Sequence, residues 1–358
     1  MKKICMLFNH FNLQDGVCRS ALSFANILAK RNDAEITLIP LFRYHKTTLG
    51  FLDSKVKVKP IFRFYFQGMS SLVKRVPAKL LYRYIIGDRY DVNIAFQFGT
   101  SQIIVSSGKS SKHLSVGWMH GYDTKMLLKK YYLKMDKMVS VSKCGAERLA
   151  IDLDNKITVD YCYNPIDDEY IRKQGKESIE YEKNTNLQLI TVGRMSEEKG
   201  IDRLLQCVRR LKEDGYHFSL WIVGDGPQLN ILKKIANELD IDDIVIFIGC
   251  KNNPHAYTSK SDLFICSSYS EGYSTACTEA IMLNVPVIST NVSGANEIIQ
   301  EAGCGEVVDS TEDGIYNGIK KILDDPNLLK EWKDILKSTK YKFSPQQRFK
   351  KFEYIIGL

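Results

Sequence analysis

The sequence predicts an α/β protein with two Rossmann-like, doubly wound domains that face each other across a cleft. Short apolar runs alternate with amphipathic stretches, and this alternation runs through the chain twice. Alternating strands and helices are typical of a parallel sheet that carries helices on both faces. The 358 residues are also enough for two separate hydrophobic cores.

The first round of the pattern predicts a domain over residues 1–164. A helix is expected over 17–29, where apolar residues recur at helical spacing. Strands are expected at the apolar runs 4–8, 36–41, 56–61, 92–98, 114–118 and 138–141.

The second round predicts a domain over residues 165–343, after a polar separating segment at 167–186. A last helix over about 344–358 begins with Ser344 as its cap and Pro345 in its first turn, and we expect it to pack back onto the first domain. Strands are expected at 187–192, 218–223, 244–248, 263–266 and 285–289, and helices at 201–212, 229–239, 314–323 and 327–336.

The composition predicts a globular protein of the cytoplasm. Its 44% hydrophobic and 26% charged residues are ordinary, and no apolar run approaches the roughly 18 residues of a membrane span. The first apolar run is short and polar residues follow at once, which favours a buried strand over a signal peptide. Nine cysteines are scattered without a Cys-x-x-Cys pair, which indicates free thiols in a reducing compartment.

The net charge of +8 is unevenly distributed between the two halves. Residues 1–163 hold 26 Lys and Arg against 12 Asp and Glu, a balance of +14, and the remainder holds 24 against 30, a balance of −6. A basic half suggests an anionic partner, either an acidic membrane surface or nucleic acid.

Four segments with small or charged residues directly follow strands of the second domain. They lie at 193–200, 224–227, 249–251 and 267–275. Because the carboxyl ends of parallel strands meet at one edge of a sheet, we expect these segments to gather around one ligand.

The residue types in these segments suit a nucleoside diphosphate bonded to a sugar. Arg194 and Lys199 are cations that can neutralise phosphate oxygens and the charge on a leaving group. Glu271 and Glu279 would repel phosphate, so we expect both to accept hydrogen bonds from hydroxyls. Backbone amides at a helix N-terminus bind anions, and here they belong to Gly272, Tyr273, Ser274 and Thr275.

The spacing Glu271-x7-Glu279 within Glu-Gly-Tyr-Ser-Thr-Ala-Cys-Thr-Glu-Ala resembles the signature of the retaining family 4 glycosyltransferases, which have the GT-B fold. The motifs Gly193-Arg194 with Lys199-Gly200, Val223-Gly224-Asp225-Gly226-Pro227 and Tyr163-Asn164-Pro165-Ile166-Asp167 are similar to the accompanying motifs, in the same order. The resemblance covers most of the chain and is clearest over 187–300.

The resemblance implies a role for each matching residue of the second domain. Arg194 and Lys199, beside Gly193, would hold the diphosphate, and the backbone around Gly249 and Lys251 would meet the base. Glu279 would bind the ribose, and Glu271 the hydroxyls of the donor sugar.

In the first domain the resemblance singles out two positions. His120 matches the active-site histidine near the transferred sugar, so Glu271 and His120 are the expected catalytic residues. Gly16 matches the glycine-bearing loop near phosphate and acceptor, although Asp15 replaces the usual first glycine. Gly224–Pro227 is either a ligand contact or a tight turn only.

The implied reaction is front-face substitution with retention, in which the leaving phosphate deprotonates the acceptor hydroxyl and no cofactor or metal takes part. A UDP-sugar is favoured over a GDP-sugar. Two Asp-x-Asp strings, at 152–154 and 240–242, resemble the metal-binding pairs of other transferases, but they fall between helices and strands and are interpreted as solvated turns.

Residues 62–90 interleave aromatic and basic side chains, a pattern that suits an anionic bilayer surface. The alternative is an amphipathic helix packed on the first sheet, and nucleic acid is disfavoured because no binding module is present. The leading hypothesis is a peripheral enzyme at the inner face of the plasma membrane that extends a polyprenyl-diphosphate-linked glycan in bacterial surface polysaccharide synthesis. A transferase for a soluble acceptor and a non-catalytic nucleotide-sugar-binding protein are the other hypotheses.

Overall fold

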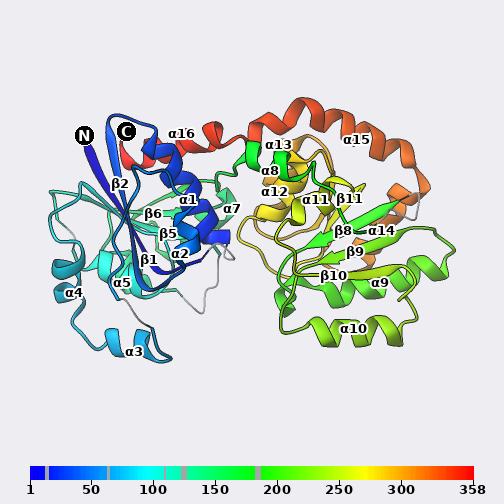
Figure 1. Cartoon of the computed structure of the whole chain (residues 1–358), viewed down its shortest axis with the longest axis horizontal. Coiled ribbons are helices and arrows are strands. Elements are labelled where there is room, and N and C mark those ends of the chain that lie inside the picture. Colours follow the sequence, from blue (N-terminus) through cyan, green and yellow to red (C-terminus); the bar gives the residue numbers. More distant parts are fainter. Residues whose placement is uncertain (13–15, 63–64, 109, 122–126, 182–186) are drawn as a thin grey trace. The chain divides into compact units, whose positions relative to one another are not determined.

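The computed structural model describes residues 1–12, 16–62, 65–108, 110–121, 127–181 and 187–358 (Figure 1). The chain divides into two compact units, which are described one at a time. Unit 1 holds Met1–Pro165 together with Pro345–Leu358, and unit 2 holds Ile166–Ser344.

Unit 1 is built on a parallel sheet of seven strands in the order β3-β2-β1-β4-β5-β6-β7. The order reverses between β1 and β4, as in a doubly wound fold. The strands are β1 (Lys2–Phe11), β2 (Ala34–Tyr44), β3 (Lys57–Val58), β4 (Val92–Ala95), β5 (Leu114–Met119), β6 (Lys137–Ser140) and β7 (Thr158–Tyr161).

Helices cover the sheet of unit 1, and the chain's last helix is one of them. Phe24 stacks on Phe352 with ring centroids 4.3 Å apart and meets Trp118 edge-on, which fixes α16 against α1 and the sheet (Figure 1). The helices are α1 (Gly16–Ala29), α2 (Lys46–Leu49), α3 (Met69–Val73), α4 (Ala78–Ile85), α5 (Thr100–Ser106), α6 (Lys129–Tyr132), α7 (Lys143–Asp152) and α16 (Pro345–Ile356).

Two strands of unit 1 are shorter than the sequence predicts. The expected strand 92–98 ends at Ala95, because the Gln97 side chain accepts the backbone N–H groups of Asn9 and His10 at 2.9 and 3.0 Å and takes the place of the sheet ladder. The expected strand 56–61 is reduced to Lys57–Val58, although the N–H groups of Lys59 and Ile61 still donate to the Leu38 and Pro40 carbonyls of β2 at 2.9 and 3.0 Å.

Unit 2 contains a parallel sheet of six strands in the order β10-β9-β8-β11-β12-β13. The strands are β8 (Gln188–Val192), β9 (Ser219–Val223), β10 (Val245–Gly249), β11 (Leu263–Cys266), β12 (Val287–Thr290) and β13 (Glu306–Val308). The order reverses between β8 and β11, so both units are doubly wound. The α/β prediction with two Rossmann-like sheets is confirmed.

The helices of unit 2 form one layer on each face of its sheet (Figure 1). One layer holds α9 (Ile201–Glu213), α10 (Leu229–Glu238) and α14 (Glu312–Asp324). The other holds α8 (Asp168–Gln174), α11 (Pro254–Ser259), α12 (Thr275–Met282) and α13 (Ala295–Ala302), and α15 (Pro326–Thr339) packs against α13 and α14.

The segment 167–186, predicted as a polar separator, is partly helical. Asp167 accepts the backbone N–H of Tyr170 and caps α8, whose Ile171 is buried. Residues 182–186 of that segment lie outside the described residues. Within the described part of the chain, no helix is both long and apolar enough to span a bilayer.

Candidate active site

The site of unit 2 lies where its strand order reverses, between β8 and β11. The loop 193–200 follows β8 and the loop 267–274 follows β11, and these strands are neighbours in the sheet. Such a switch point leaves a crevice at the carboxyl ends of the strands, where doubly wound folds bind their ligands.

Lys199 and Glu271 meet across this switch point. Lys199 Nζ donates a hydrogen bond to Glu271 Oε1 at 2.6 Å, and Ser268 Oγ donates to the same oxygen at 2.8 Å. Burial lowers the pKa of Lys199, but the charge and hydrogen bond of Glu271 outweigh it, so the net shift is upward. Lys199 therefore stays cationic, and its partner is Glu271 rather than the adjacent Glu197 or Glu198.

The backbones of the two loops hold this ion pair in place. Tyr269 N–H donates to the Glu198 carbonyl at 2.8 Å, and Ser267 Oγ donates to the Lys199 carbonyl at 3.0 Å. Gly200 has a φ of +57°, and a Cβ at this position would lie 2.2 Å from the Ser267 carbonyl oxygen. Glycine at 200 is thus required by the close approach of the two loops.

A second close approach joins the loops after β8 and β9. Gly224 has a φ of +145°, and a Cβ there would lie 1.9 Å from the Gly193 carbonyl oxygen. Met195 N–H donates to the Asp225 carbonyl at 2.9 Å, and Gly224 N–H donates to the Gly249 carbonyl at 2.9 Å. Gly224 therefore has a structural role that does not depend on a ligand, since it joins three neighbouring strand ends into one rim.

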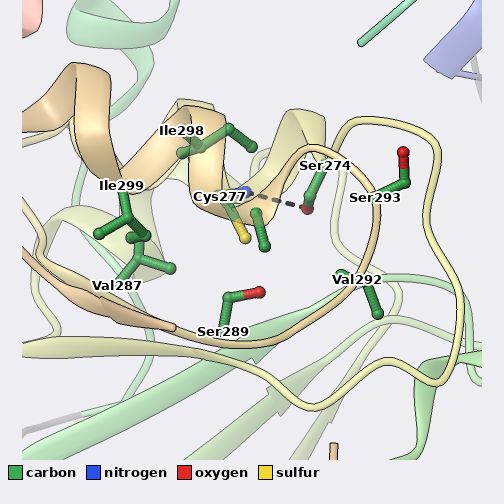
Figure 2. A pocket seen from close by; sticks show the side chains of 9 residues that line it. Ser274, Cys277, Val287, Ser289, Val292, Ser293, Ile298 and Ile299 are labelled. Atoms are coloured by element: carbon green, nitrogen blue, oxygen red, sulfur yellow. Dashed lines mark hydrogen bonds between the residues drawn. The ribbon is translucent and has the colours of Figure 1, made fainter. Parts of the chain in front are cut away.

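The first turn of α12 closes the other side of the site. Ser274 caps this helix by accepting the Cys277 N–H at 3.3 Å, as Figure 2 shows. Tyr273 is buried and lies so close to Gly294 that a Cβ at position 294 would touch its ring. Its side chain therefore has a packing role. Thr275 and Gly272 are half-buried beside it.

Two small hollows flank this turn. One lies over β11 and β8, and its lining includes four of the predicted site residues: Gly193, Lys199 and Ser274 of the donor-binding set and the catalytic candidate Glu271. The other lies on the β12 side and is lined mostly by apolar side chains, with Ser274, Ser289 and Ser293 at its polar positions (Figure 2). The first hollow is the candidate donor site.

Three other predicted residues lie around this hollow or on the rim beyond it. Arg194 is exposed, and its guanidinium forms no ion pair with a described residue. Glu279 Oε2 lies 3.8 Å from Nδ1 of the buried His255 on α11. Lys251 pairs with Glu180 at 2.9 Å, so on this side of Gly249 the backbone is better placed than the lysine to meet a ligand.

The buried Arg203 is a positioning residue that the sequence analysis missed. Its Nε and Nη2 atoms donate to the Ser267 carbonyl at 2.8 and 2.6 Å, and Nη2 also donates to the Ser268 carbonyl at 2.6 Å. Tyr269 covers the guanidinium, whose Cζ lies 4.0 Å from the ring centroid. The sequence did contain a signal for its burial: Arg203 lies one helical turn before Cys207 and therefore on the buried face of α9.

The switch point of unit 1 lies between β1 and β4, and the side chains of Asn9 and Gln97 there are uncharged amides. Asn9 receives the Ser101 N–H at 3.0 Å and donates to the Phe98 carbonyl, while Gln97 accepts two N–H groups at the end of β1. Gly16 is exposed at the start of α1, and Asp15 lies outside the described residues.

His120 follows β5, is half-buried and packs on an aromatic ring. Its ring centroid lies 4.7 Å from that of Phe96, and neither ring nitrogen reaches solvent or bonds to a described residue in good geometry. Burial lowers the pKa of His120 to about 3, against a smaller opposing effect of the Phe96 backbone. The imidazole is therefore neutral at physiological pH.

The Asp-x-Asp strings lie at exposed turns, except that Asp152 is half-buried and ends α7. Asp154 pairs with Lys129 and Lys156, both at 3.0 Å, and Asp242 accepts a hydrogen bond from Asn237. Among the residues that the structure describes, no group of three or more His, Cys, Asp or Glu side chains is placed to hold a metal ion.

Comparison with known families places this site in a matched region. Residues 173–338 match the family described as "Glycosyl transferases group 1". The N-acetylgalactosamine-N,N'-diacetylbacillosaminyl-diphospho-undecaprenol 4-alpha-N-acetylgalactosaminyltransferase of Campylobacter jejuni is 30% identical over 219 residues, 60% of this chain and 58% of that protein. The lipopolysaccharide core biosynthesis glycosyltransferase LpsD of Rhizobium meliloti is 30% identical over 141 residues, 39% of this chain and 40% of that protein. The chain thus matches less than two thirds of the length of these curated relatives.

Solved structures resemble the chain over its full length. The lipopolysaccharide outer core galactosyltransferase WaaB superimposes with a TM-score of 0.74 at 18% identity and covers 99% of both chains. HepE of Anabaena in complex with UDP-glucose gives a TM-score of 0.76 at 15% identity and covers 100% of both chains. The chain therefore has the GT-B fold, and the region that holds Lys199, Glu271 and Glu279 is the one that matches the glycosyl transferases group 1 family.

Proposed function

We propose that this chain is a retaining, metal-independent glycosyltransferase of family 4. It moves a sugar from a nucleotide sugar, with UDP-sugars favoured, to a glycan on a polyprenyl diphosphate in bacterial surface polysaccharide synthesis. The observation that carries this proposal is the Lys199–Glu271 pair at the switch point of unit 2, inside the region that matches a glycosyltransferase family.

The relatives support the substrate classes in this proposal. The Campylobacter jejuni relative is named for an acceptor on diphospho-undecaprenol, and HepE was solved with UDP-glucose. Other relatives are named for lipopolysaccharide core and colanic acid biosynthesis.

The cations supply the charge that the donor diphosphate needs. An ammonium has three donors, so Lys199 can hold Glu271 with one and reach phosphate oxygens with the others. Arg194 has no ion pair among the described residues and is free to add a bidentate contact. Together they stabilise the negative charge that develops as the nucleoside diphosphate leaves.

The acids orient the donor through its hydroxyls. Glu271 is held by Lys199 and Ser268 and keeps further acceptor positions for the hydroxyls of the transferred sugar. Glu279 projects from α12 beside His255 and binds the ribose. A sugar fixed at both ends reaches the transition state with little further ordering.

His120 contributes no charge. Because burial holds its pKa at about 3, the imidazole is neutral and cannot act as a general acid near neutral pH. The leaving phosphate takes the proton of the attacking acceptor hydroxyl on the face that it leaves. The anomeric configuration is then retained.

The test begins with a thermal-shift screen of UDP-, GDP- and ADP-sugars, because a ligand that binds the folded state raises the melting temperature by mass action. The stabilising donor is then incubated with alkyl-diphosphate sugars, and NMR gives the anomeric configuration of the product. The expected result is a retained linkage that forms equally well in EDTA.

Each alternative predicts another outcome. Turnover only with water-soluble sugars would favour a soluble acceptor. Donor binding without release of nucleoside diphosphate in the presence of any acceptor would identify a non-catalytic binding protein and refute the proposal. An inverted product would refute retention alone.

Docking to the cytoplasmic face of an anionic membrane is part of the same proposal. The region around α3 and α4 exposes Phe66, Leu72, Val76, Leu80 and Tyr84, which are 49%, 58%, 42%, 54% and 76% exposed. Leu80 and Tyr84 are one helical turn apart on α4, so they share a face. We call these five residues the docking surface.

Basic residues accompany the docking surface. No Asp or Glu occurs from 54 to 87, and none of four exposed cations there forms an ion pair with a described residue. Each cation near an anionic bilayer contributes about 1 kcal/mol. The four are Lys74, Arg75, Lys79 and Arg83. Arg63 and Phe64 of the predicted 62–90 stretch lie outside the described residues.

Vesicle flotation tests this docking. Changing the four cations to Gln should reduce binding to vesicles with 30% phosphatidylserine by at least tenfold, and binding should also weaken with salt. The matched control removes four exposed cations elsewhere in unit 1: Lys30, Lys112, Lys130 and Lys134. Equal losses in both variants would indicate general charge attraction and contradict a specific docking surface.

A further inference from the structure

Unit 1 carries an aromatic and cationic cluster at the carboxyl ends of β1 and β2, outside the positions that the family resemblance singles out. Arg43 is exposed, and its Cζ atom lies 4.9 Å from the centroid of the Tyr65 ring. His10 meets the same ring edge-on, with centroids 5.3 Å apart, and also packs on Phe42 at 5.6 Å. Phe62 stacks on Phe42, at 5.9 Å and 7° between the planes, and completes the cluster.

The guanidinium of Arg43 has no acidic partner among the described residues. It forms no ion pair with any residue that the structure describes, and the chain has no Asp or Glu from 54 to 87, the stretch that holds Tyr65. An arginine stacked on an aromatic face keeps its in-plane N–H groups available at its edge. Such a group suits the bidentate binding of phosphate.

The strand register places Arg43 level with His120. Leu7 of β1 pairs with Ala95 of β4, and Ala95 pairs with Gly117 of β5, so these three residues are in register. His10 lies three residues after Leu7, and His120 lies three residues after Gly117. His10 in turn pairs directly with Arg43.

Arg43 and His120 therefore mark two ends of one row along the edge of the sheet. They are separated by the spacing of β2, β1, β4 and β5, three intervals of about 4.8 Å, or about 14 Å in all. This distance accommodates a sugar bonded to a diphosphate.

The docking surface lies next to the Arg43 end of this row. Tyr65, which carries the guanidinium, directly precedes Phe66 of the docking surface, and β3 lies beside β2 at the edge of the sheet. A lipid held at the docking surface would present its phosphate groups at the headgroup level, beside Arg43.

We propose that Arg43, stacked on Tyr65, binds the diphosphate of the lipid-linked acceptor, and that the acceptor glycan extends along the strand ends from Arg43 toward His120. This inference rests on the proposed function and adds the acceptor subsite and its polarity. The aromatic rings of His10 and Phe42 hold Tyr65 in place, and Arg43 selects a charged acceptor over a neutral one.

The test compares two forms of one acceptor. N-acetylhexosamines and hexoses are offered as undecyl diphosphates and as neutral undecyl glycosides, and kcat/KM is measured for both. The wild-type protein should prefer the diphosphate form at least tenfold, and Arg43→Gln should reduce this preference below twofold. Arg43→Lys should give an intermediate value, because it keeps the charge but loses the planar fork.

Lys112→Gln is the matched control. Lys112 is an exposed cation of unit 1 that precedes β5, so it lies at the amino edge of the same sheet. This variant should keep the preference of the wild-type protein. A wild-type protein without preference for the diphosphate, or an Arg43→Gln variant that retains the preference, would overturn the inference.

Two further measurements separate this inference from its foundations. If the wild-type protein transfers to no acceptor, the proposed function fails, and calorimetry with inorganic pyrophosphate decides the subsite alone. The background for this measurement is the double variant Arg194→Gln with Lys199→Gln, which removes the two predicted phosphate-binding cations of unit 2. In that background Arg43→Gln should weaken pyrophosphate binding at least fivefold. Unchanged binding would overturn the inference. Flotation identifies the source of the phosphate: a loss of vesicle binding in Arg43→Gln with the diphosphate preference intact would assign Arg43 to membrane phospholipid instead.

Discussion

The two sheets share one winding plan, but among the described residues their switch points differ in side-chain chemistry: one holds an ion pair and the other holds uncharged amides. In unit 2 a cation and an acid, Lys199 and Glu271, meet at 2.6 Å and are braced by backbone hydrogen bonds and by the buried Arg203. In unit 1 the same position holds the neutral side chains of Asn9 and Gln97.

This contrast is the one that the two ligands of the proposed function require. Fixed charges with prearranged partners suit the diphosphate of a donor, where negative charge develops during the reaction. A neutral, aromatic rim with its cation at one end suits an amphipathic acceptor. The fold supplies the position of each site, and the side chains after each strand decide its chemistry.

The largest predicted effect comes from removing Lys199, the cation at the switch point of unit 2. Lys199→Ala should lower kcat/KM at least a hundredfold, about 3 kcal/mol, because the leaving diphosphate loses its preorganised partner. Steady-state kinetics measure this, and circular dichroism should show an intact fold. Lys212→Ala breaks the surface pair with Asp243 in the same unit and should leave the kinetics unchanged. Near-normal turnover in Lys199→Ala would mean that this charge is not needed for transfer. The contrast between the two switch points would then have no bearing on the reaction.

The second prediction concerns the backbone that frames this charge. Gly224→Ala should destabilise unit 2 by roughly 3 kcal/mol, since the new Cβ meets the Gly193 carbonyl in a backbone conformation that already disfavours alanine. Gly215→Ala is the control, because it also has a positive φ but nothing within 4 Å of the added Cβ. Thermal unfolding should show a clearly larger loss for Gly224→Ala. Equal losses would mean that backbone conformation alone, and not the close approach of the loops, requires the glycine.

The third prediction uses the neutral histidine of unit 1. The pKa of His120 is lowered to about 3 in the folded state, so between about pH 6.5 and 3 the unfolded chain takes up a proton that the folded chain refuses. The stability that His120 contributes is complete above pH 6.5 and falls as the solution is acidified, by about 2 kcal/mol from pH 7 to pH 5. Denaturant unfolding of wild type and His120→Gln at both pH values should show a smaller acid loss in the variant. The same loss in both would mean that the His120 ring is not shielded from water in the folded state.

The sequence predicts those strands and helices that have a clear local pattern of apolar residues. Buried parallel strands such as β8 and β11 are near-continuous apolar runs and are found readily. The strands β7 and β13 were missed, because each is a short edge strand whose residues are mostly half-buried, and such strands leave no apolar run. The helix α8 was missed because its segment is polar and only Ile171 is buried.

The site depends on distances that no local pattern contains. The sequence indicates that Lys199 and Glu271 belong to one edge, but their direct pairing joins residues 72 positions apart and emerges only from the order of β8 and β11. Arg43 reads as the end of a strand until the fold brings Tyr65 beneath it. Long-range packing supplied both contacts.

The smallest effect distinguishes two histidines, one in each unit. His255 is buried whereas His120 is half-buried, and the Nδ1 of His255 lies 3.8 Å from the carboxylate of Glu279. If His255 orients this acid for the ribose, His255→Phe should raise the donor KM about fivefold, about 1 kcal/mol, and leave kcat nearly unchanged, because ribose contacts stabilise the ground state and the transition state alike. His255→Asn, which retains a polar group at the site, should recover part of the loss. A fall in kcat with an unchanged KM would mean that Glu279 acts on the reacting sugar, and the division of roles between Glu271 and Glu279 would then have to be reversed.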